Sequence, residues 1–289
     1  MSTRDTINPR VLLGGLAFVE SPRWHDGRLW FAHWGAGEIV AVDLDGDSEV
    51  VRPGPPGFGW SVDWLPDGRL LVTGDGLTRH DPDGSTHRYA GLDVLSEDWN
   101  EIVVDGRGNC YLNGRCDFAP PEGEAPGIIA LVTPGSTGDI SPRQVADGLA
   151  FPNGMAVTPD NSTLIVAESL GGRLTAFDIA DDGDLSNRRT WADLTGGYPD
   201  GICIDAEGAV WHADVPNQRC VRVAEGGDVL QTVELDRGAF ACTLGGPDRR
   251  TLFILAAEWR GMEHAAEALA ARTGQVLTVP APAPGAGWP

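Results

Sequence analysis

The residues with the clearest chemical potential are an acid and an amide in matching surroundings. Asp200 lies in Tyr-Pro-Asp-Gly at 198–201, and Asn153 lies in Phe-Pro-Asn-Gly at 151–154. Together with Glu20 they offer only oxygen atoms, which suit hard cations such as Ca²⁺, Mg²⁺ or Mn²⁺, while Zn²⁺ also accepts carboxylates. Two carboxylates would balance one dication. The alternative is that these residues only satisfy backbone groups at strand ends, as Asx turns do.

These side chains can meet only if the elements that carry them are repeated in space. Six hairpin turns recur at intervals of 41, 40, 53, 47 and 41 residues, and they close at Gly27, Gly68, Gly108, Asn161, Gly208 and Arg249. A period of roughly 40 to 50 residues is typical of four-stranded propeller blades. Gly and Asp-Gly turns suit positive φ, and the Val, Ile, Trp and Phe between them suit strands. We therefore predict an all-β fold, a six-bladed β-propeller with four-stranded antiparallel blades.

The ends of the chain and two insertions complete this prediction. Residues 10–13 are expected to pair with 274–279 and close the ring, which removes exposed strand edges. Residues 262–272 are rich in helix formers and predict a helix within the sixth blade. Residues 116–126 predict a loop over one mouth of the channel. We expect a single domain over 1–289, folded from about 10 to 280, with a loosely held low-complexity tail at 281–289.

A propeller explains how distant polar residues could form one site. The innermost strand of each blade begins near one face of the central channel, so equivalent first-strand positions meet there. Counting back seven or eight positions from each turn leads to Glu20, Trp60 or Ser61, Asn100, Asn153, Asp200, and Ala241 or Cys242. Four of the six positions carry a carboxylate or a carboxamide. This equivalent placement favours a metal site over unrelated Asx turns.

Four segments, in this order, resemble the hallmark stretches of the senescence marker protein/gluconolactonase/regucalcin-like family. They are Glu-Ser-Pro-Arg-Trp at 20–24 and the segments 151–156, 198–205 and 241–248. The resemblance implies a six-bladed propeller in which Glu20, Asn153 and Asp200 hold one divalent metal ion (Ca²⁺, Mg²⁺, Mn²⁺ or Zn²⁺). It also implies a metal-dependent lactonase that acts on a small-molecule lactone. Our mechanistic hypothesis is that the metal polarises the lactone carbonyl while Asp200, as the catalytic residue, accepts a proton from the attacking water.

The predicted substrate-binding residues lie at the expected starts of two innermost strands, those of the third and the second blade. They are Asp98, Trp99, Asn100, Glu101 and Trp60. The resemblance implies that Asn100 contacts substrate or water on the metal. Sugar-lactone members of the family carry Arg where this chain has Asp98, and Asp where it has Glu101. Because Asp98 would repel acidic ligands, a gluconolactone-like substrate does not follow from the resemblance, and a plain role in an exposed loop is equally compatible with an acid here.

For most of the other residues that could do chemistry, we favour a structural role. Trp60 and Trp99 sit beside predicted channel positions and are the better pocket candidates. The remaining candidates are expected to pack within or between blades: Trp24, Trp211, His33 and His212. The sequence has no G-x-S-x-G elbow, Walker loop or H-E-x-x-H motif, which argues against serine hydrolases, P-loop enzymes and zinc proteases.

The composition limits the classes of partner that we expect for this protein. A formal net charge of −21 would repel phosphates, so we expect no nucleic-acid partner. The N-terminus has no apolar core of a signal peptide and no apolar run reaches membrane-spanning length, so we expect a cytoplasmic protein without a membrane partner. The five cysteines are widely spread and are expected to be reduced. A monomer or a weak homo-oligomer is expected.

Two competing interpretations remain at this point. One keeps the metal but changes the reaction to isomerisation, dehydration or ring formation, with Asp98 and Glu101 taking part. The other is a non-catalytic propeller that binds a cation or a protein, since one fold hosts unrelated functions. The set of Glu20, Asn153 and Asp200 favours an enzyme, because a scaffold needs no three oxygen ligands in its channel. A substrate panel would separate hydrolysis from the other reactions.

Overall fold

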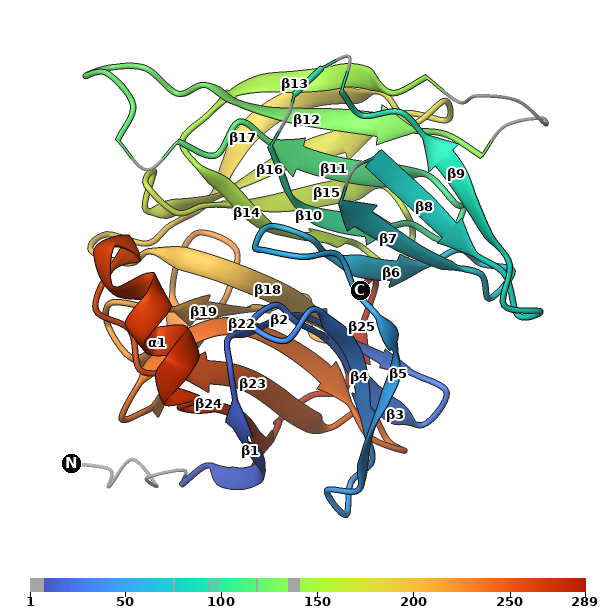
Figure 1. Cartoon of the computed structure of the whole chain (residues 1–289). Coiled ribbons are helices and arrows are strands. Elements are labelled where there is room, and N and C mark those ends of the chain that lie inside the picture. The colour runs from blue at the N-terminus through green and yellow to red at the C-terminus, as the bar shows by residue number, and fades with distance from the viewer. Residues whose placement is uncertain (1–7, 75, 94, 97, 118, 135–140) are drawn as a thin grey trace.

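A computed structural model describes residues 8–289 except 75, 94, 97, 118 and 135–140. These residues form six β-sheets arranged as a propeller, as Figure 1 shows. Within each sheet, neighbouring strands run antiparallel. The predicted six-bladed propeller is therefore confirmed. No helix within the described ranges has the length and the apolar character that crossing a membrane requires.

Each blade runs outward from an innermost strand. The innermost strands contact one another in a closed ring: β2 (Val19–His25), β6 (Val62–Trp64), β10 (Trp99–Val104), β14 (Pro152–Val157), β18 (Pro199–Asp205) and β22 (Gly238–Gly245). The second strands are β3 (Arg28–His33), β7 (Leu70–Gly74), β11 (Cys110–Gly114), β15 (Thr163–Glu168), β19 (Val210–Asp214) and β23 (Thr251–Ala257). The third are β4 (Glu38–Val42), β8 (Gly76–His80), β12 (Gly127–Val132), β16 (Arg173–Ile179), β20 (Arg219–Val223) and β24 (Gly274–Pro280). The outer ones are β5 (Ser48–Pro53), β9 (Thr86–Ala90), β13 (Arg143–Leu149), β17 (Leu185–Asp193), β21 (Val229–Glu234) and β1 (Arg10–Leu16).

The turns that defined the repeat have the backbone conformation that the sequence predicts. All six closing residues lie at positive φ, from 56° at Arg249 to 86° at Gly108. Glycine reaches this region without steric cost and Asn visits it readily, which explains why five of the six positions are Gly or Asn. The repeat period therefore reflects one local turn geometry that is used once in every blade.

Ring closure and the helical insertion also follow the prediction. Strand β1 pairs antiparallel with β24, with Arg10 opposite Thr278, and it supplies the outer strand of the sixth blade. Between β23 and β24, a short 3₁₀ turn, η1 (Met262–His264), leads into helix α1 (Ala265–Ala271). Leu269 of this helix packs on the cluster that contains Phe18 and Phe240. The insertion thus lies beside strand starts that face the channel.

The prediction of a loosely held tail at 281–289 is wrong. Strand β25 (Gly285–Ala286) pairs antiparallel with the innermost strand β18, so this blade has five strands. Trp288 forms a bridge with Val157 of the neighbouring blade. The physical reason is that an innermost strand has a free edge, whose backbone groups need partners. Glycine also permits close approach here, since a Cβ on Gly285 would lie 2.7 Å from Leu244 Cβ.

Candidate active site

The starts of four innermost strands deliver polar side chains to one cavity of about 890 Å³. Each of these residues is the second one of its strand: Glu20 in β2, Asn100 in β10, Asn153 in β14 and Asp200 in β18. The repeat-equivalent positions that the sequence predicts therefore do come together. Their roles as metal ligands and substrate contacts stay predictions.

A bulge at three of these four positions aims the polar residue. In β18 the pairing passes from Pro199 opposite Asp214 to Ile202 opposite His212, which leaves Asp200 and Gly201 outside the regular ladder. The pairings of β10 and β14 shift at the same place, whereas in β2 Glu20 pairs with Ala32 and the shift follows it. Bulges re-aim side chains and are common beside functional sites. The three equivalent shifts indicate that these blades share one local geometry for presenting a side chain to the channel.

The glycines that follow Asn153 and Asp200 have a steric reason. A Cβ on Gly154 would lie 2.5 Å from Asp200 O and 2.5 Å from Ile202 N, both backbone atoms of the next blade. A Cβ on Gly201 would lie 2.6 Å from Ala241 Cα. Only glycine lets neighbouring innermost strands approach this closely. The Asn-Gly and Asp-Gly pairs therefore combine a residue that faces the channel with one that permits the packing.

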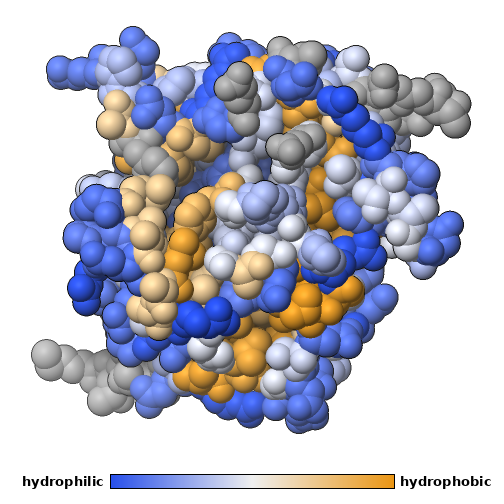
Figure 2. All heavy atoms as spheres, in the orientation of Figure 1, coloured by the Kyte–Doolittle hydropathy of each residue, from blue (hydrophilic) through white to orange (hydrophobic). Residues whose placement is uncertain are grey.

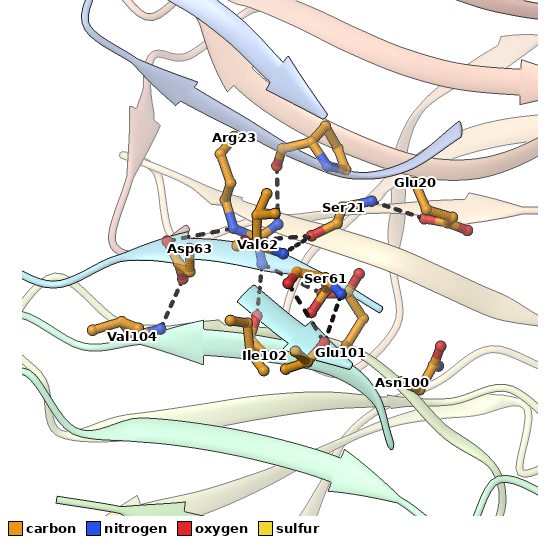
Figure 3. A network of polar contacts seen from close by, with 12 residues as sticks. Glu20, Ser21, Arg23, Ser61, Val62, Asp63, Asn100, Glu101, Ile102 and Val104 are labelled. Atoms are coloured by element: carbon orange, nitrogen blue, oxygen red, sulfur yellow. Dashed lines mark hydrogen bonds and ion pairs between the residues drawn. The ribbon is translucent and has the colours of Figure 1, made fainter. Parts of the chain in front are cut away.

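The acids of the channel outnumber the cations that face them. Figure 3 shows Arg23 between Asp63 and Glu101, and the ion-pair distances are 3.5 Å from Nε to Asp63 Oδ1 and 3.3 Å from Nη2 to Glu101 Oε2. Glu20 is 6% exposed, and its carboxylate accepts a hydrogen bond from Ser21 N at 3.2 Å. Glu20 and Asp200 have no ion-pair partner among the residues that the structure describes. These two acids therefore lack the direct ion pair that Asp63 and Glu101 have.

Burial and mutual repulsion both act on these acids. Burial, followed by the negative charges of Asp200 and Glu101, raises the pKa of Glu20 well above its usual range. Burial, followed by the charge of Glu101, also raises the pKa of Asp200 well above its usual range, against an opposing hydrogen bond from Asn153. A divalent cation between the two carboxylates would remove this penalty, because an opposite charge favours the ionised forms.

The two carboxylates can hold such a cation with a third side-chain oxygen only if an amide supplies that oxygen. Among the described residues, no three His, Cys, Asp or Glu side chains are grouped to hold a metal ion. The third oxygen would therefore come from Asn153, whose Oδ1 accepts a hydrogen bond from Asn100 Nδ2 at 3.1 Å. Asn153 Nδ2 in turn lies 3.4 Å from Ser169 Oγ. These two hydrogen bonds fix the orientation of the Asn153 amide, with its oxygen directed toward Asn100.

Four of the five predicted substrate-binding residues line the cavity: Trp60, Asp98, Trp99 and Asn100. Glu101 is placed elsewhere. It is 8% exposed, pairs with Arg23, and lines a separate small space together with Pro289 and Cys242. Its ion pair with Arg23 of another blade holds the Glu101 side chain in that second space. This part of the sequence-based prediction is corrected.

The aromatic and histidine residues that were expected to have structural roles lie outside the cavity lining. Trp24 stacks on Phe253, and Trp211 is fully buried between blades. His33 Nε2 accepts a hydrogen bond from Ala17 N at 2.9 Å. None of these residues, nor His212, is among the described residues that line the cavity. Of the predicted loop at 116–126, Cys116 lines the cavity, while residue 118 lies outside the described residues.

His212 gives a testable pH dependence of stability. Burial lowers the pKa of His212 from 6.5 to about 4, with weaker effects of Asp214 and Arg219. Between these two values the unfolded chain binds more protons than the folded one, so stability must fall as the pH is lowered through this window. The free energy of unfolding should thereby fall by about 3 kcal/mol on account of His212, and we expect the His212→Gln variant to lack this decrease. Urea unfolding of both proteins between pH 7 and 4 measures the difference.

The matched control for that experiment is His87→Gln, because the His87 side chain is 53% exposed. It should keep the pH dependence of the original protein. If the stability difference between the original protein and His212→Gln does not change across the window, burial of neutral His212 is not the cause.

The cavity contains residues that sequence reasoning missed, and seven of them are aromatic. They include Phe18, Trp34, Phe58, Phe151, Tyr198, Phe240 and Trp259. One signal was available in the sequence. Phe18, Phe151 and Tyr198 each stand two residues before a predicted metal ligand. Trp34, Phe58 and Trp259 come from connecting segments whose place over the channel depends on the folded ring.

Comparison with known proteins adds independent information. A family model described as "SMP-30/Gluconolactonase/LRE-like region" matches residues 18–258. A regucalcin of Xenopus laevis is 38% identical over 117 residues, which are 38% of this chain and 39% of that protein. A 6-deoxy-6-sulfogluconolactonase of Pseudomonas putida is 30% identical over 128 residues, which are 43% of this chain and 44% of that protein. The chain thus spans less than half the length of these curated relatives.

The fold has relatives among solved structures. A calcium-binding protein, regucalcin, from Agrobacterium tumefaciens superposes with a TM-score of 0.78 over 99% of this chain and 97% of that chain. The two sequences are 20% identical, so this likeness shows the fold alone.

Proposed function

Because the chain belongs to the SMP-30/gluconolactonase/LRE-like family, we propose that it is a hydrolase that opens a small-molecule lactone with one divalent metal ion as its cofactor. The observation that carries the proposal is the meeting of Glu20, Asn153 and Asp200 in one cavity, with both acids unpaired. All-oxygen ligands suit Ca²⁺, Mg²⁺, Mn²⁺ or Zn²⁺. The calcium-binding relative from Agrobacterium tumefaciens supports Ca²⁺ as the first ion to test.

The proposed mechanism assigns proton transfer to Asp200. When bound, the ion supplies a Lewis acid for the lactone carbonyl oxygen. Asp200 then accepts a proton from the water whose oxygen adds to the carbonyl carbon. The ring C–O bond breaks, and the same proton passes to the released ring oxygen, which yields a hydroxy acid. Asp200 is assigned this role because its carboxylate lines the cavity beside the position proposed for the ion, where the attacking water would be held.

Asn100 and Asn153 would orient the reactants. Their amides are linked by a hydrogen bond of 3.1 Å, and Ser169 Oγ donates to Pro199 O at 2.7 Å, next to Asp200. These bonds fix the polar groups before substrate enters, which reduces reorganisation during the reaction. A reaction that uses Glu101 as an acid or a base has less support, because this side chain is paired with Arg23 away from the cavity.

The test combines metal analysis with a lactone screen. We expect the purified protein to bind one divalent ion per chain and to release acid from at least one lactone in a pH-stat. A chelator should stop the reaction, and Ca²⁺, Mn²⁺, Mg²⁺ or Zn²⁺ should restore it. Bound metal with every lactone intact would favour a different metal-dependent reaction, and no bound metal would favour a non-catalytic propeller. Hydrolysis by a metal-free protein would show that the metal role is wrong.

A further inference from the structure

Five residues near the starts of innermost strands surround the cavity. Phe18, Asp98, Phe151 and Tyr198 each stand two residues before the second residue of their strand, namely Glu20, Asn100, Asn153 and Asp200, and Phe240 lies in the innermost strand β22. All five line the cavity. We call these five residues the collar. Four collar residues are aromatic, and Asp98 is the single charged one.

Further rings extend the collar into an apolar wall. The Phe18 ring lies 5.6 Å from Trp34, 5.4 Å from Phe58, 4.5 Å from Phe240 and 5.2 Å from Trp259, between ring centroids. Trp34 and Phe58 also contact each other edge to face at 5.7 Å. We call these five residues the aromatic wall. Phe58 is 43% exposed, so part of the wall is open to a ligand.

Three of the four tryptophans that line the cavity have their ring N–H groups engaged and present mainly carbon surface to a ligand. Trp34 Nε1 donates to Trp60 O at 2.6 Å, Trp60 Nε1 to Gly57 O at 3.2 Å, and Trp99 Nε1 to Ser96 O at 3.1 Å. A ligand hydroxyl placed against these rings would lose its hydrogen bonds to water without replacement, which costs free energy. This side of the cavity therefore disfavours the hydroxyl groups of a sugar.

The charge of the cavity disfavours anions. Its charged lining residues are all acids, Glu20, Asp98 and Asp200, and no described Arg or His lines it. The sequence contains no Lys at all, and the chain has a formal net charge of −21. Arg115, near the collar in sequence, donates to Leu95 O and is thereby engaged. In the orientation of Figure 2, hydrophilic residues cover most of the periphery and apolar residues show between them.

The size of the cavity agrees with a ligand larger than one small ring. At about 890 Å³ it lies near the upper end of the roughly 300 to 1,000 Å³ that is usual for drug-sized ligands. An unsubstituted lactone ring beside Glu20 and Asp200 would leave the aromatic wall without a contact. An apolar substituent would fill this space and gain from burial.

We propose that the natural substrate is an uncharged lactone with an alkyl or aryl substituent that packs on the aromatic wall. The proposal rests on the lactonase function proposed above and names its substrate class. The ester group lies at Glu20 and Asp200, and the substituent points toward Phe58 and Trp259. Gluconolactone and anionic sugar lactones are excluded as preferred substrates by the apolar wall and by Asp98.

The first test compares kcat/KM across four lactones with the metal-loaded protein. The probes are δ-valerolactone, the same ring with a phenyl group beside the ring oxygen, gluconolactone, and the phosphate ester of gluconolactone. We expect the phenyl-substituted lactone to exceed δ-valerolactone by about tenfold or more, the effect of burying one ring. Gluconolactone or its phosphate ester as the preferred substrate would overturn the proposal.

The second test removes one ring of the wall. Phe58→Ala should lower the ratio of kcat/KM for the phenyl-substituted lactone to that for δ-valerolactone about tenfold. The matched control is Val50→Ala, which truncates a residue that is 55% exposed on the outer strand β5, and it should leave this ratio unchanged. An unchanged ratio in a folded Phe58→Ala protein would contradict the assignment of the wall.

A binding measurement separates the two proposals. The lactams that correspond to δ-valerolactone and its phenyl derivative resist hydrolysis, and quenching of tryptophan fluorescence reports their binding. If no lactone is opened but the phenyl lactam binds about tenfold more tightly than the plain lactam, and less tightly to Phe58→Ala, then the lactonase function fails while the ligand class stands. Equal binding of both lactams would overturn the ligand class, whatever the hydrolysis result.

Discussion

Asp200→Asn is expected to lower lactonase activity about a thousandfold while the protein stays folded. The substitution keeps the size of the side chain and removes its negative charge, so the proton acceptor is lost. It also removes one of the two unpaired acids that would hold the metal, and metal content should fall with activity. Since Asp200 and Glu20 repel each other in the metal-free protein, the variant should unfold at the same or a higher temperature.

The matched control is Asp26→Asn, at the other end of strand β2. The Asp26 side chain is 83% exposed, and its backbone has a positive φ of 48° that Asn tolerates well. This variant should keep full activity and metal content. Asp200→Asn with full activity and normal metal content would show that another group is the base.

Gly154→Ala is expected to destabilise the protein by about 2 kcal/mol or more, even though it adds one methyl group. The new Cβ would meet Asp200 O and Ile202 N at 2.5 Å. Both are backbone atoms of β18, so they can move only if the strand that carries Asp200 moves. We therefore expect the folded fraction to lose activity as well, because Asn153 and Asp200 would separate. Urea unfolding and kcat/KM of the same preparation measure the two effects.

Gly14→Ala serves as the control for this substitution. A Cβ at Gly14 would have its nearest neighbours at 3.9 Å, an ordinary contact, in the strand β1. The control should change stability by less than about 1 kcal/mol, since it creates no overlap. Similar stability of Gly154→Ala and Gly14→Ala would mean that the innermost strands are not as tightly packed as the structure indicates.

The repeat was readable in the sequence because it depends on local geometry. The turns at Gly27, Gly68 and Asn161 need positive φ, and this requirement selects Gly or Asn at fixed intervals. Once the period gives a propeller, equivalent positions must face the same channel. This reasoning was enough to bring Glu20, Asn153 and Asp200 together, since the symmetry of the ring does the positioning.

The C-terminal segment and Glu101 were not predictable in the same way. Low-complexity sequence at 281–289 carries no apolar pattern, yet β25 pairs through its backbone with the free edge of β18. Glu101 has the residue type of a site acid, but Arg23 of another blade neutralises it. Both outcomes depend on which distant group lies opposite, and no local pattern encodes that.

By itself, the sequence determined the number of blades, the closure of the ring by β1, and the polar set that faces the channel. Each of these follows from a repeated local requirement: a turn, a strand start, or a glycine. The tertiary structure alone decided that two acids lie unpaired and that Phe58 and Trp259 join Phe18 in one wall. The reason is physical. Charge compensation and aromatic packing are sums over neighbours from several blades, and these neighbours are defined only when the ring has closed.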